Sequence, residues 1–189
     1  MDSARITKRK LVYDDWYKLY QIVIQLPDGV LTPRHLLDSG SAVAVLPYDP
    51  DRRVCMLIKQ PRAPVLAAGE ASLYEAIAGR LDGASPEDRI VEEALEEGGL
   101  RLSKFLEPIT NMWSLSPLST ERVQLYLSTY RADDRVAEGG GAHDENEAIS
   151  VHEISLDSLR QMVLSGELTD AKTLILAQAL LLRHPDLWN

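Results

Sequence analysis

The sequence predicts an α/β protein, and three observations lead to this class. Short segments rich in apolar and β-branched residues recur along the chain and are separated by turn signals, as expected for strands. A capped helix interrupts them after residue 85, and two more helical patterns follow near the C-terminus. The chain of 189 residues is 45% hydrophobic and 26% charged, which is typical of a globular protein with an ordinary core.

The first forty residues predict a small antiparallel sheet. Residues 11–26 are rich in aromatic and β-branched side chains and end at the turn Pro27-Asp28-Gly29. Clustered aromatic side chains can stack on bases, but a packed or dimer-forming strand surface is the simpler interpretation. We therefore expect residues 1–40 to form a β-sheet for dimerisation and residues 41–189 to form the main domain.

A β-hairpin is expected at the start of the main domain. Residues 41–48 and 53–59 are short apolar runs joined by a turn. Gln60 and Arg62 follow the second run directly. An arginine at a strand end is either a surface charge or a contact for phosphate or another part of a substrate. Residues 61–69 are expected to be a loop.

Residues 73–79 predict a short strand that leads through a glycine-containing loop into a helix. Ser85 is a good N-cap, and Pro86 suits the first helical position, where its missing N–H costs nothing. The pair Gly98-Gly99 supplies a residue that can adopt the left-handed conformation that ends a helix. The helix should therefore run from Pro86 to about Glu97.

This helix is strongly acidic. Its expected apolar stripe is Ile90, Val91, Ala94 and Leu95, and its expected polar face is Glu92, Glu93, Glu96 and Glu97. Like charges at such spacing cost about a few tenths of a kcal/mol each, so a positive group should lie nearby. The glutamates are either a solvated face partly neutralised by Arg89 or a cation site. Ligands that are all oxygen suit Mg²⁺ or Mn²⁺ rather than Zn²⁺.

The remaining elements are strands and two terminal helices. Strands are expected over residues 105–113, 122–130 and 149–154, and the second of these alternates like a half-buried strand. Helices are expected over residues 156–164 and 170–182, the second with Asp170 as its N-cap and a wide apolar face.

The acidic helix and its preceding loop resemble the signature of the Nudix hydrolases. The matching positions are Gly79, Glu93, Ala94, Glu96, Glu97, Gly99 and Leu100. Glu92 stands where the family has arginine, and the loop is one residue short, so Ala84 or Ser85 replaces an early glutamate. In the family those two residues mostly orient the helix, so their loss bears on efficiency more than on binding.

The resemblance implies an α/β/α sandwich with a mixed sheet, together with a Mg²⁺ or Mn²⁺ site. The implied metal ligands are the Ala78 backbone and the carboxylates of Glu93, Glu96 and Glu97. Glu97 is also implied among the catalytic groups.

Other segments resemble the branch that contains ADP-ribose and GDP-mannose pyrophosphatases. The loop 114–121 is similar to a Ser-Pro-Gly loop that shapes the substrate pocket of this branch, although Leu118 stands nearest to the glycine. The segment 166–173 is also similar. Glu75 is either an outward-facing edge residue or, as the resemblance implies, a residue near the metals. The implied substrate contacts are Arg62, Gln60, Glu75, Ser116 and Glu121.

The acidic stretch that follows the glycines at 139–141 is a candidate for a mobile loop that delivers a base. On composition alone, a solvated acidic hairpin is the simpler interpretation. The resembled branch carries its water-activating glutamate in this loop. Glu145 matches that residue best, and Glu147 is the alternative.

The resemblance implies a homodimeric, Mg²⁺-dependent pyrophosphatase. It would split a nucleoside diphosphate linked to a sugar, of the GDP-mannose or ADP-ribose type, into a nucleoside monophosphate and a sugar phosphate. The two departures at Glu92 and at Ala84 or Ser85 motivate an alternative, in which an impaired domain binds a nucleotide as a sensor or scaffold without hydrolysing it.

Charge and composition narrow the partners. A net charge of −9 without a basic stripe argues against nucleic-acid binding. We expect no membrane segment, since no apolar run reaches spanning length and no hydrophobic stretch follows the charged N-terminus. Cys55 is the single cysteine and lies in an apolar run, which indicates a buried thiol and a reducing cytoplasm.

Overall fold

The chain divides into two compact units, each described here by itself. The first comprises Met1–Ser41 together with Trp113–Val123, and the second comprises Ala42–Met112 together with Gln124–Asn189. The coordinates are a computed structural model that describes residues 3–141 and 147–188. The sequence analysis placed residues 113–123 in the main domain, whereas by their contacts they group with the N-terminal strands.

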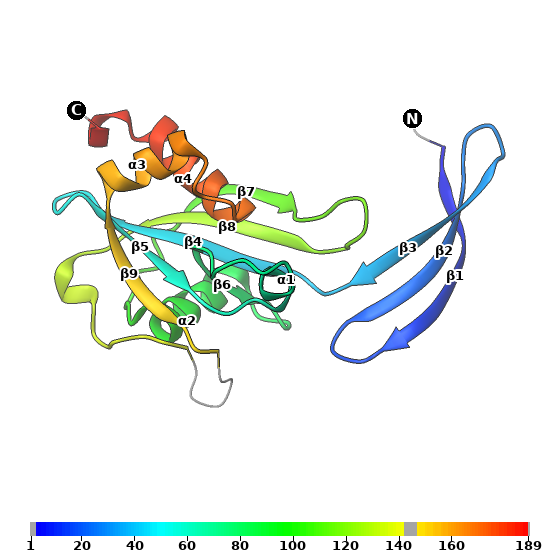
Figure 1. Cartoon of the computed structure of the whole chain (residues 1–189), viewed down its shortest axis with the longest axis horizontal. Coiled ribbons are helices and arrows are strands. Elements are labelled where there is room, and N and C mark those ends of the chain that lie inside the picture. Colours follow the sequence, from blue (N-terminus) through cyan, green and yellow to red (C-terminus); the bar gives the residue numbers. More distant parts are fainter. Residues whose placement is uncertain (1–2, 142–146, 189) are drawn as a thin grey trace. The chain divides into compact units, whose positions relative to one another are not determined.

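The first unit is built on a three-stranded sheet with the order β1-β2-β3 (Figure 1). Both strand pairs are antiparallel, which confirms the small sheet predicted for this region. The strands are β1 (Arg5–Asp14), β2 (Lys18–Gln25) and β3 (Leu31–Asp38). The continuous β-run expected over residues 11–26 is wrong in one respect, because a turn at 15–17 separates two strands. There the Asp15 carboxylate accepts a hydrogen bond from the Trp16 amide at 2.8 Å, which favours a turn over an extended strand.

The loop before β8 docks on the end of β3. The Leu37 amide donates to the Leu118 carbonyl at 2.8 Å, and the Thr120 amide donates back to the Leu37 carbonyl at 2.9 Å. These two bonds form a short parallel bridge between Leu37 and Ser119. Pairing of segments so distant in the chain leaves no local signal in the sequence.

The second unit is built on a mixed sheet with the order β7-β8-β4-β5-β9, and β6 pairs with β4. β4 and β5 form the predicted antiparallel hairpin, and β5 pairs antiparallel with β9. β4 and β8 run in the same direction in Figure 1, so the sheet contains both orientations. The strands are β4 (Ala42–Asp49), β5 (Val54–Lys59), β6 (Ile77–Arg80), β7 (Glu107–Trp113), β8 (Arg122–Thr129) and β9 (Ser150–Ser155).

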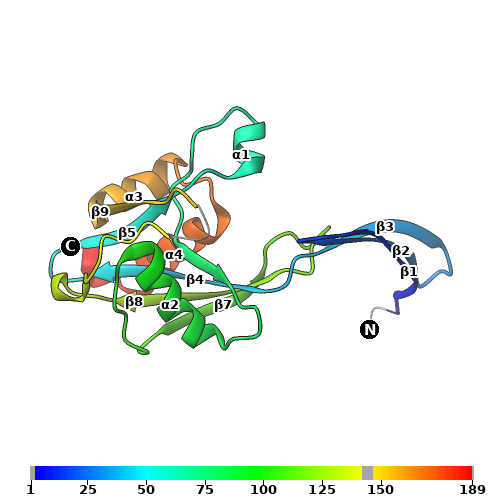
Figure 2. The same ribbon diagram turned by 90° about the horizontal axis from the view of Figure 1, so that it is seen from below.

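Helices cover both faces of this sheet, which confirms the α/β/α sandwich. Figure 2 shows α2 on one face and α3 and α4 on the other. The helices are α1 (Ala63–Ala67), α2 (Pro86–Gly98), α3 (Leu156–Ser165) and α4 (Ala171–Arg183), with short 3₁₀ turns at Ala132–Asp134 and Pro185–Trp188. The loop expected over residues 61–69 is wrong where α1 forms, because a proline in the first turn is compatible with a helix.

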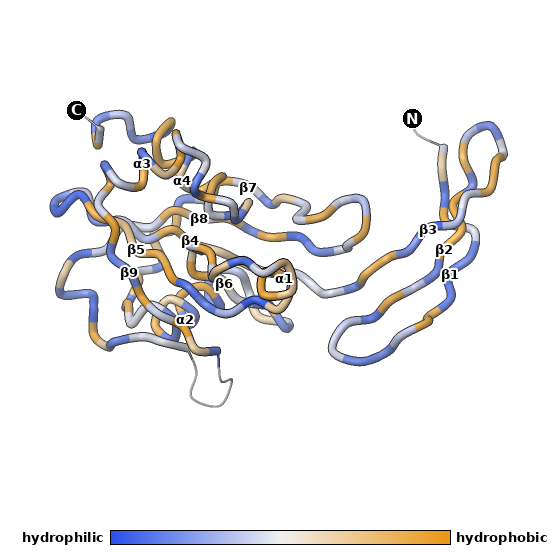
Figure 3. The backbone as a smooth tube through the Cα atoms, viewed as in Figure 1, coloured by the Kyte–Doolittle hydropathy of each residue, from blue (hydrophilic) through white to orange (hydrophobic). Residues whose placement is uncertain are grey.

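The core lies between the sheet and its helices. β4 is buried on both faces, as expected when helices pack on each side of a strand, and β4 and β5 are mainly hydrophobic in Figure 3. One buried cluster joins Ile90 and Ala94 of α2 to residues of the sheet and to the residue that follows Gly99; its members include Val43, Val45, Met56, Ile58, Ile77, Ile90, Ala94 and Leu100. Across residues 3–141 and 147–188, every helix is too short or too polar to cross a bilayer.

Candidate active site

The ends of α2 are fixed by the residues that the sequence indicated. Ser85 is the N-cap, and its hydroxyl accepts a hydrogen bond from the Asp88 amide at 3.1 Å. Gly99 adopts a φ of 66° at the C-terminus, where its amide donates to Leu95. The bond from Gly99 to Leu95 is that of the αL capping motif, and the Leu100 amide donates to Ala94 at 2.9 Å. The predicted helix boundaries are confirmed.

The orientation of α2 differs from the expected one. Glu93 and Glu97 are buried with Ile90 and Ala94, whereas Leu95 is 44% exposed. The prediction that the four glutamates lie together on the side opposite the apolar stripe is therefore wrong. Positions 90, 93, 94 and 97 follow the i, i+3, i+4, i+7 spacing of one helical face, so the sequence did contain the signal. Because this face carries two glutamates, it does not resemble the buried side of a helix. The more hydrophobic stripe, which includes Val91 and Leu95, therefore looks like the buried face in the sequence alone.

The two buried glutamates lie against β6. The Glu97 side chain accepts a hydrogen bond from the Ala78 amide at 3.0 Å. Burial raises the pKa of Glu97 to about 8, and the charge of Glu93 adds to this rise. Burial also raises the pKa of Glu93 to about 7. A Cβ atom at position 79 would overlap Oε1 of Glu93, so only glycine leaves room for this carboxylate.

Arg89 is the cation that accompanies these carboxylates on α2. It forms an ion pair with Glu93 and lies 3.3 Å from Glu92 and 3.7 Å from Glu96. The pKa of Glu93 nevertheless stays raised, because burial outweighs the attraction of Arg89. Negative charge at the buried pair is thus only partly compensated, and a divalent cation would relieve it.

The predicted metal ligands are not equally placed. Glu93 and Glu97 meet beside Ala78, whereas the Glu96 side chain is 41% exposed and faces Arg89. In the part of the chain that the structure describes, no three His, Cys, Asp or Glu side chains form a ready-made metal cage. The chemistry of two buried carboxylates still fits Mg²⁺ or Mn²⁺, which take few protein ligands and complete their shells with water and phosphate.

A second charged cluster lies between β5 and the start of α4. Glu75 is 3% exposed, and Arg62 binds both of its oxygens, at 3.0 and 2.9 Å. Lys172 binds Oε2 of Glu75 at 2.6 Å. The interpretation of Glu75 as an outward-facing edge residue is wrong, because residue 75 bridges to Ile58 of β5 inside the fold. The Arg62 side chain is 40% exposed and pairs with this buried carboxylate, and its role as a phosphate contact stays a prediction.

Lys172 was missed by the sequence analysis. Asp170 caps α4 by accepting from the Thr173 amide at 3.1 Å, and the Thr173 hydroxyl accepts from the Ala76 amide at 2.6 Å. The start of α4 is thereby tied to the residue after Glu75, which brings Lys172 beside it. The segment 166–173 had been noted only for its resemblance, and a lysine just inside a helix start carries no signal by itself.

The glycines at 139–141 dock on the C-terminal end of α2. The Gly140 amide donates to the Glu97 carbonyl at 2.9 Å, and the Gly141 amide donates to the Glu96 carbonyl at 3.0 Å. A Cβ atom on Gly139 would overlap the Glu97 carbonyl oxygen. These bonds place the three glycines beside α2, and the mobility expected of the acidic stretch that follows them stays a prediction.

Of the two candidate bases, Glu145 lies outside the described residues and Glu147 lies within them. A Cβ at Gly141 would come within 2.7 Å of Oε2 of Glu147, so the side chain packs on the docked glycines. Its charge contributes to the raised pKa values of Glu93 and Glu97 and of Arg62. Glu147 is therefore an electrostatic neighbour of the buried pair.

Comparison with known proteins identifies the family. The chain is 33% identical over 187 residues to the GDP-mannose pyrophosphatase of Cronobacter sakazakii, and the match covers 96% of each chain. It is 32% identical over 184 residues to the protein of that name from Pectobacterium atrosepticum, with 94% of each chain covered. The chain belongs to the Nudix hydrolases.

Further comparisons agree with the Nudix assignment. The GDP-mannose pyrophosphatase of Escherichia coli O157:H7 is 29% identical over 185 residues and covers 95% of each chain. A crystal structure of an ADP compounds hydrolase superimposes with a TM-score of 0.73 over 96% of each chain, and at 14% identity this likeness shows the fold. No family model matches the chain.

The other predicted contacts of this Nudix enzyme lie apart from α2 in the sequence. Gln60 directly follows β5 and is 4% exposed. Ser116 and Glu121 belong to the first compact unit, where the Glu121 amide donates to the Ser119 hydroxyl at 3.0 Å. Their role as substrate contacts stays a prediction.

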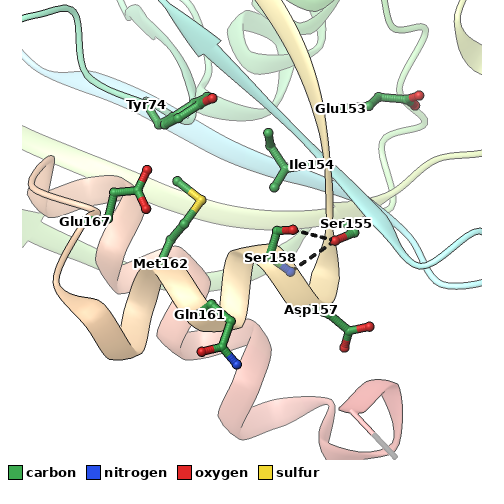
Figure 4. A pocket seen from close by; sticks show the side chains of 9 residues that line it. All are labelled: Tyr74, Glu153, Ile154, Ser155, Asp157, Ser158, Gln161, Met162 and Glu167. Carbon is green, nitrogen blue, oxygen red and sulfur yellow. Dashed lines mark hydrogen bonds between the residues drawn. The ribbon is translucent and has the colours of Figure 1, made fainter.

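A pocket of about 570 Å³ lies beside β9 and α3 (Figure 4). Its size would suit a small ligand. Its lining residues are Tyr74, Glu153, Ile154, Ser155, Asp157, Ser158, Gln161, Met162 and Glu167. Ser155 is occupied in capping α3, since it accepts from the Ser158 amide at 3.1 Å. None of the predicted site residues lines this pocket.

Proposed function

We propose that this Nudix hydrolase is a pyrophosphatase that splits a nucleoside diphosphate linked to a sugar, of the GDP-mannose or ADP-ribose type. The products would be a nucleoside monophosphate and a sugar phosphate. The observation that carries the proposal is the buried and undercompensated pair Glu93 and Glu97 in a chain 33% identical to a GDP-mannose pyrophosphatase. A diphosphate brings negative charge, so such a pair can face it only with a cation between them.

The proposed cofactor is Mg²⁺, or Mn²⁺ in its place. Glu93 and Glu97 would hold it, with Glu96 and the backbone carbonyl of Ala78 as further ligands. When bound, the cation would neutralise the diphosphate and polarise its bridging bond. Metal binding requires both buried acids to lose their protons, and their pKa values of about 7 and about 8 make this loss dependent on pH near neutrality.

The proposed general base is Glu147, and Glu145 is the alternative candidate. A base must lie near the water that attacks phosphorus, and the coupling of Glu147 to the buried pair supports such a location. The carboxylate would take a proton from this water as the new oxygen–phosphorus bond forms. Glu97 is less suited to this task, because its carboxylate already accepts the Ala78 amide and would be committed to the cation.

The proposed anion contacts are Arg62 and Lys172. Both cations are held by Glu75, so each has a fixed position from which a remaining N–H can reach phosphate. The negative charges of Glu97 and Glu147 help to raise the pKa of Arg62, which supports a location of Arg62 near the proposed metal site. Gln60, Ser116 and Glu121 would complete the contacts to the substrate.

We also propose that the protein is a cytoplasmic homodimer joined through the β1–β3 sheet. The support is a number of large side chains exposed on β1 and in the turn that follows it, which a monomer would leave in water. They include Ile6, Leu11, Val12, Tyr13, Trp16 and Tyr17. The free, buried thiol of Cys55 is compatible with a reducing compartment.

The test is hydrolysis of a panel of nucleotide sugars by purified protein with Mg²⁺ or Mn²⁺, with product analysis. We expect a nucleoside monophosphate and a sugar phosphate from at least one member. No turnover of any member, while a nucleotide sugar binds, would support the alternative, a sensor or scaffold domain.

The variants Glu147→Gln and Glu145→Gln show which of the two residues is the general base. For the true base, we expect kcat to fall by about two orders of magnitude while metal binding stays within a few fold. The other variant is the matched control. If neither variant slows turnover, the base lies elsewhere.

A further inference from the structure

Arg89 reaches one turn along α2 and contacts three carboxylates. Its Nη2 pairs with Oε1 of Glu93, and its Nη1 lies 3.3 Å from Glu92 and 3.7 Å from Glu96. The Arg89 side chain is 23% exposed, so its guanidinium sits at the rim of the site rather than in bulk water. We propose that Arg89 is a positioning residue that holds the Glu93 carboxylate in the orientation in which it binds a divalent cation.

The Glu93 carboxylate is constrained from two sides. On one side it lies against Gly79, where a Cβ atom would overlap its Oε1. On the other side Arg89 pairs with the same oxygen. Because both contacts involve Oε1, they restrict the position of this oxygen, and the cation would bind at Oε2. A planar guanidinium suits this task because its donors point in fixed directions.

The two possible roles of Arg89, as a positioning residue or as a positive charge alone, predict opposite changes in cation affinity when the residue is removed. If Arg89 acted only through its charge, its removal would delete a repulsive positive group and tighten cation binding. If it orients Glu93, its removal frees the carboxylate to rotate, and the affinity for the cation falls. Loss of a residue that orients a metal ligand typically weakens metal binding by about 10-fold to 100-fold. The sign of the change therefore separates the two roles.

The experiment measures Mn²⁺ affinity without substrate, by electron paramagnetic resonance of the free ion or by calorimetry. We expect Arg89→Gln to weaken Mn²⁺ binding by about tenfold or more. Arg89→Lys keeps the charge but loses the planar fork, so we expect an intermediate affinity. Thermal unfolding in EDTA checks that each variant is folded.

Glu92→Gln is the matched control. Glu92 lies on the same helix, 3.3 Å from Nη1 of Arg89, and its replacement by glutamine changes the local charge by one unit. We expect its Mn²⁺ affinity to stay within about threefold of the wild type. An Arg89→Gln protein that binds Mn²⁺ as tightly as the wild type, or more tightly, overturns the positioning role.

This inference rests on the proposed function only through the divalent cation. A wild type that binds Mn²⁺ but splits no nucleotide sugar would overturn the proposed activity and leave the role of Arg89 intact. A wild type that binds no Mn²⁺ would overturn both.

Discussion

The metal-free protein should lose stability as the pH rises from 6 to 8, because the pKa of Glu97 is raised by burial. In the unfolded chain this carboxyl has a pKa near 4.5, and in the folded chain its pKa is about 8. Between these values the folded state binds more protons, so stability is fully present at low pH and is lost as the pH rises toward 8. Glu93, with a pKa of about 7, acts in the same direction.

The size of the effect follows from the proton linkage. Each pH unit in this window costs up to about 1.4 kcal/mol for one group, so Glu97 alone accounts for about 2 kcal/mol between pH 6 and 8. For a protein of this length, that corresponds to a fall in Tm of roughly 5 °C. A divalent cation that binds the ionised pair should reverse the loss, since it binds only the folded state.

The assay is thermal unfolding at pH 6 and pH 8, in EDTA and in millimolar Mg²⁺. We expect the Tm in EDTA to be lower at pH 8, and Mg²⁺ to restore more of it at pH 8 than at pH 6. Glu97→Gln is the control, because an amide does not titrate, and its Tm should depend less on pH. Equal Tm values for the wild type in EDTA at both pH values would refute the reasoning.

Three further predictions follow from the packing. Gly79→Ala should displace the Glu93 carboxylate and weaken Mg²⁺ binding by about tenfold or more, and its cost in Tm should vanish in a Glu93→Ala background, which removes the overlap. Lys172→Met should leave Glu75 paired with Arg62 and raise the KM for a nucleotide sugar by about tenfold, with a smaller change in kcat. Light scattering at micromolar concentration should give about twice the mass of 21.1 kDa, and a monomer would exclude the β1–β3 dimer.

The sequence was informative wherever a structure depends on neighbouring residues. The ends of α2 were predicted because Ser85, Pro86 and Gly99 act within one turn of the helix. The hairpin of β4 and β5 was predicted because its turn is short. Both features depend only on residues that are close together in the sequence, so the sequence is enough to predict them.

The sequence was less informative where a partner comes from a distant part of the chain. Glu75 looked like an edge residue because Arg62 and Lys172 approach it from other elements. The burial of Glu93 and Glu97 was overlooked because a carboxylate is expected in solvent unless a partner is known. Here the amide of Ala78, on β6, is such a partner for Glu97.

The docking of the glycines on α2 has a consequence for the electrostatics of the helix end. The C-terminus of a helix carries a partial negative charge, which makes it a poor place for Glu96 and Glu97. The amides of Gly140 and Gly141 donate to the carbonyls of these two residues and so offset part of that charge. Because these bonds involve only backbone atoms, replacing a glutamate by glutamine should leave them in place. A change in metal binding in such a variant can then be assigned to the carboxylate rather than to a displaced helix end.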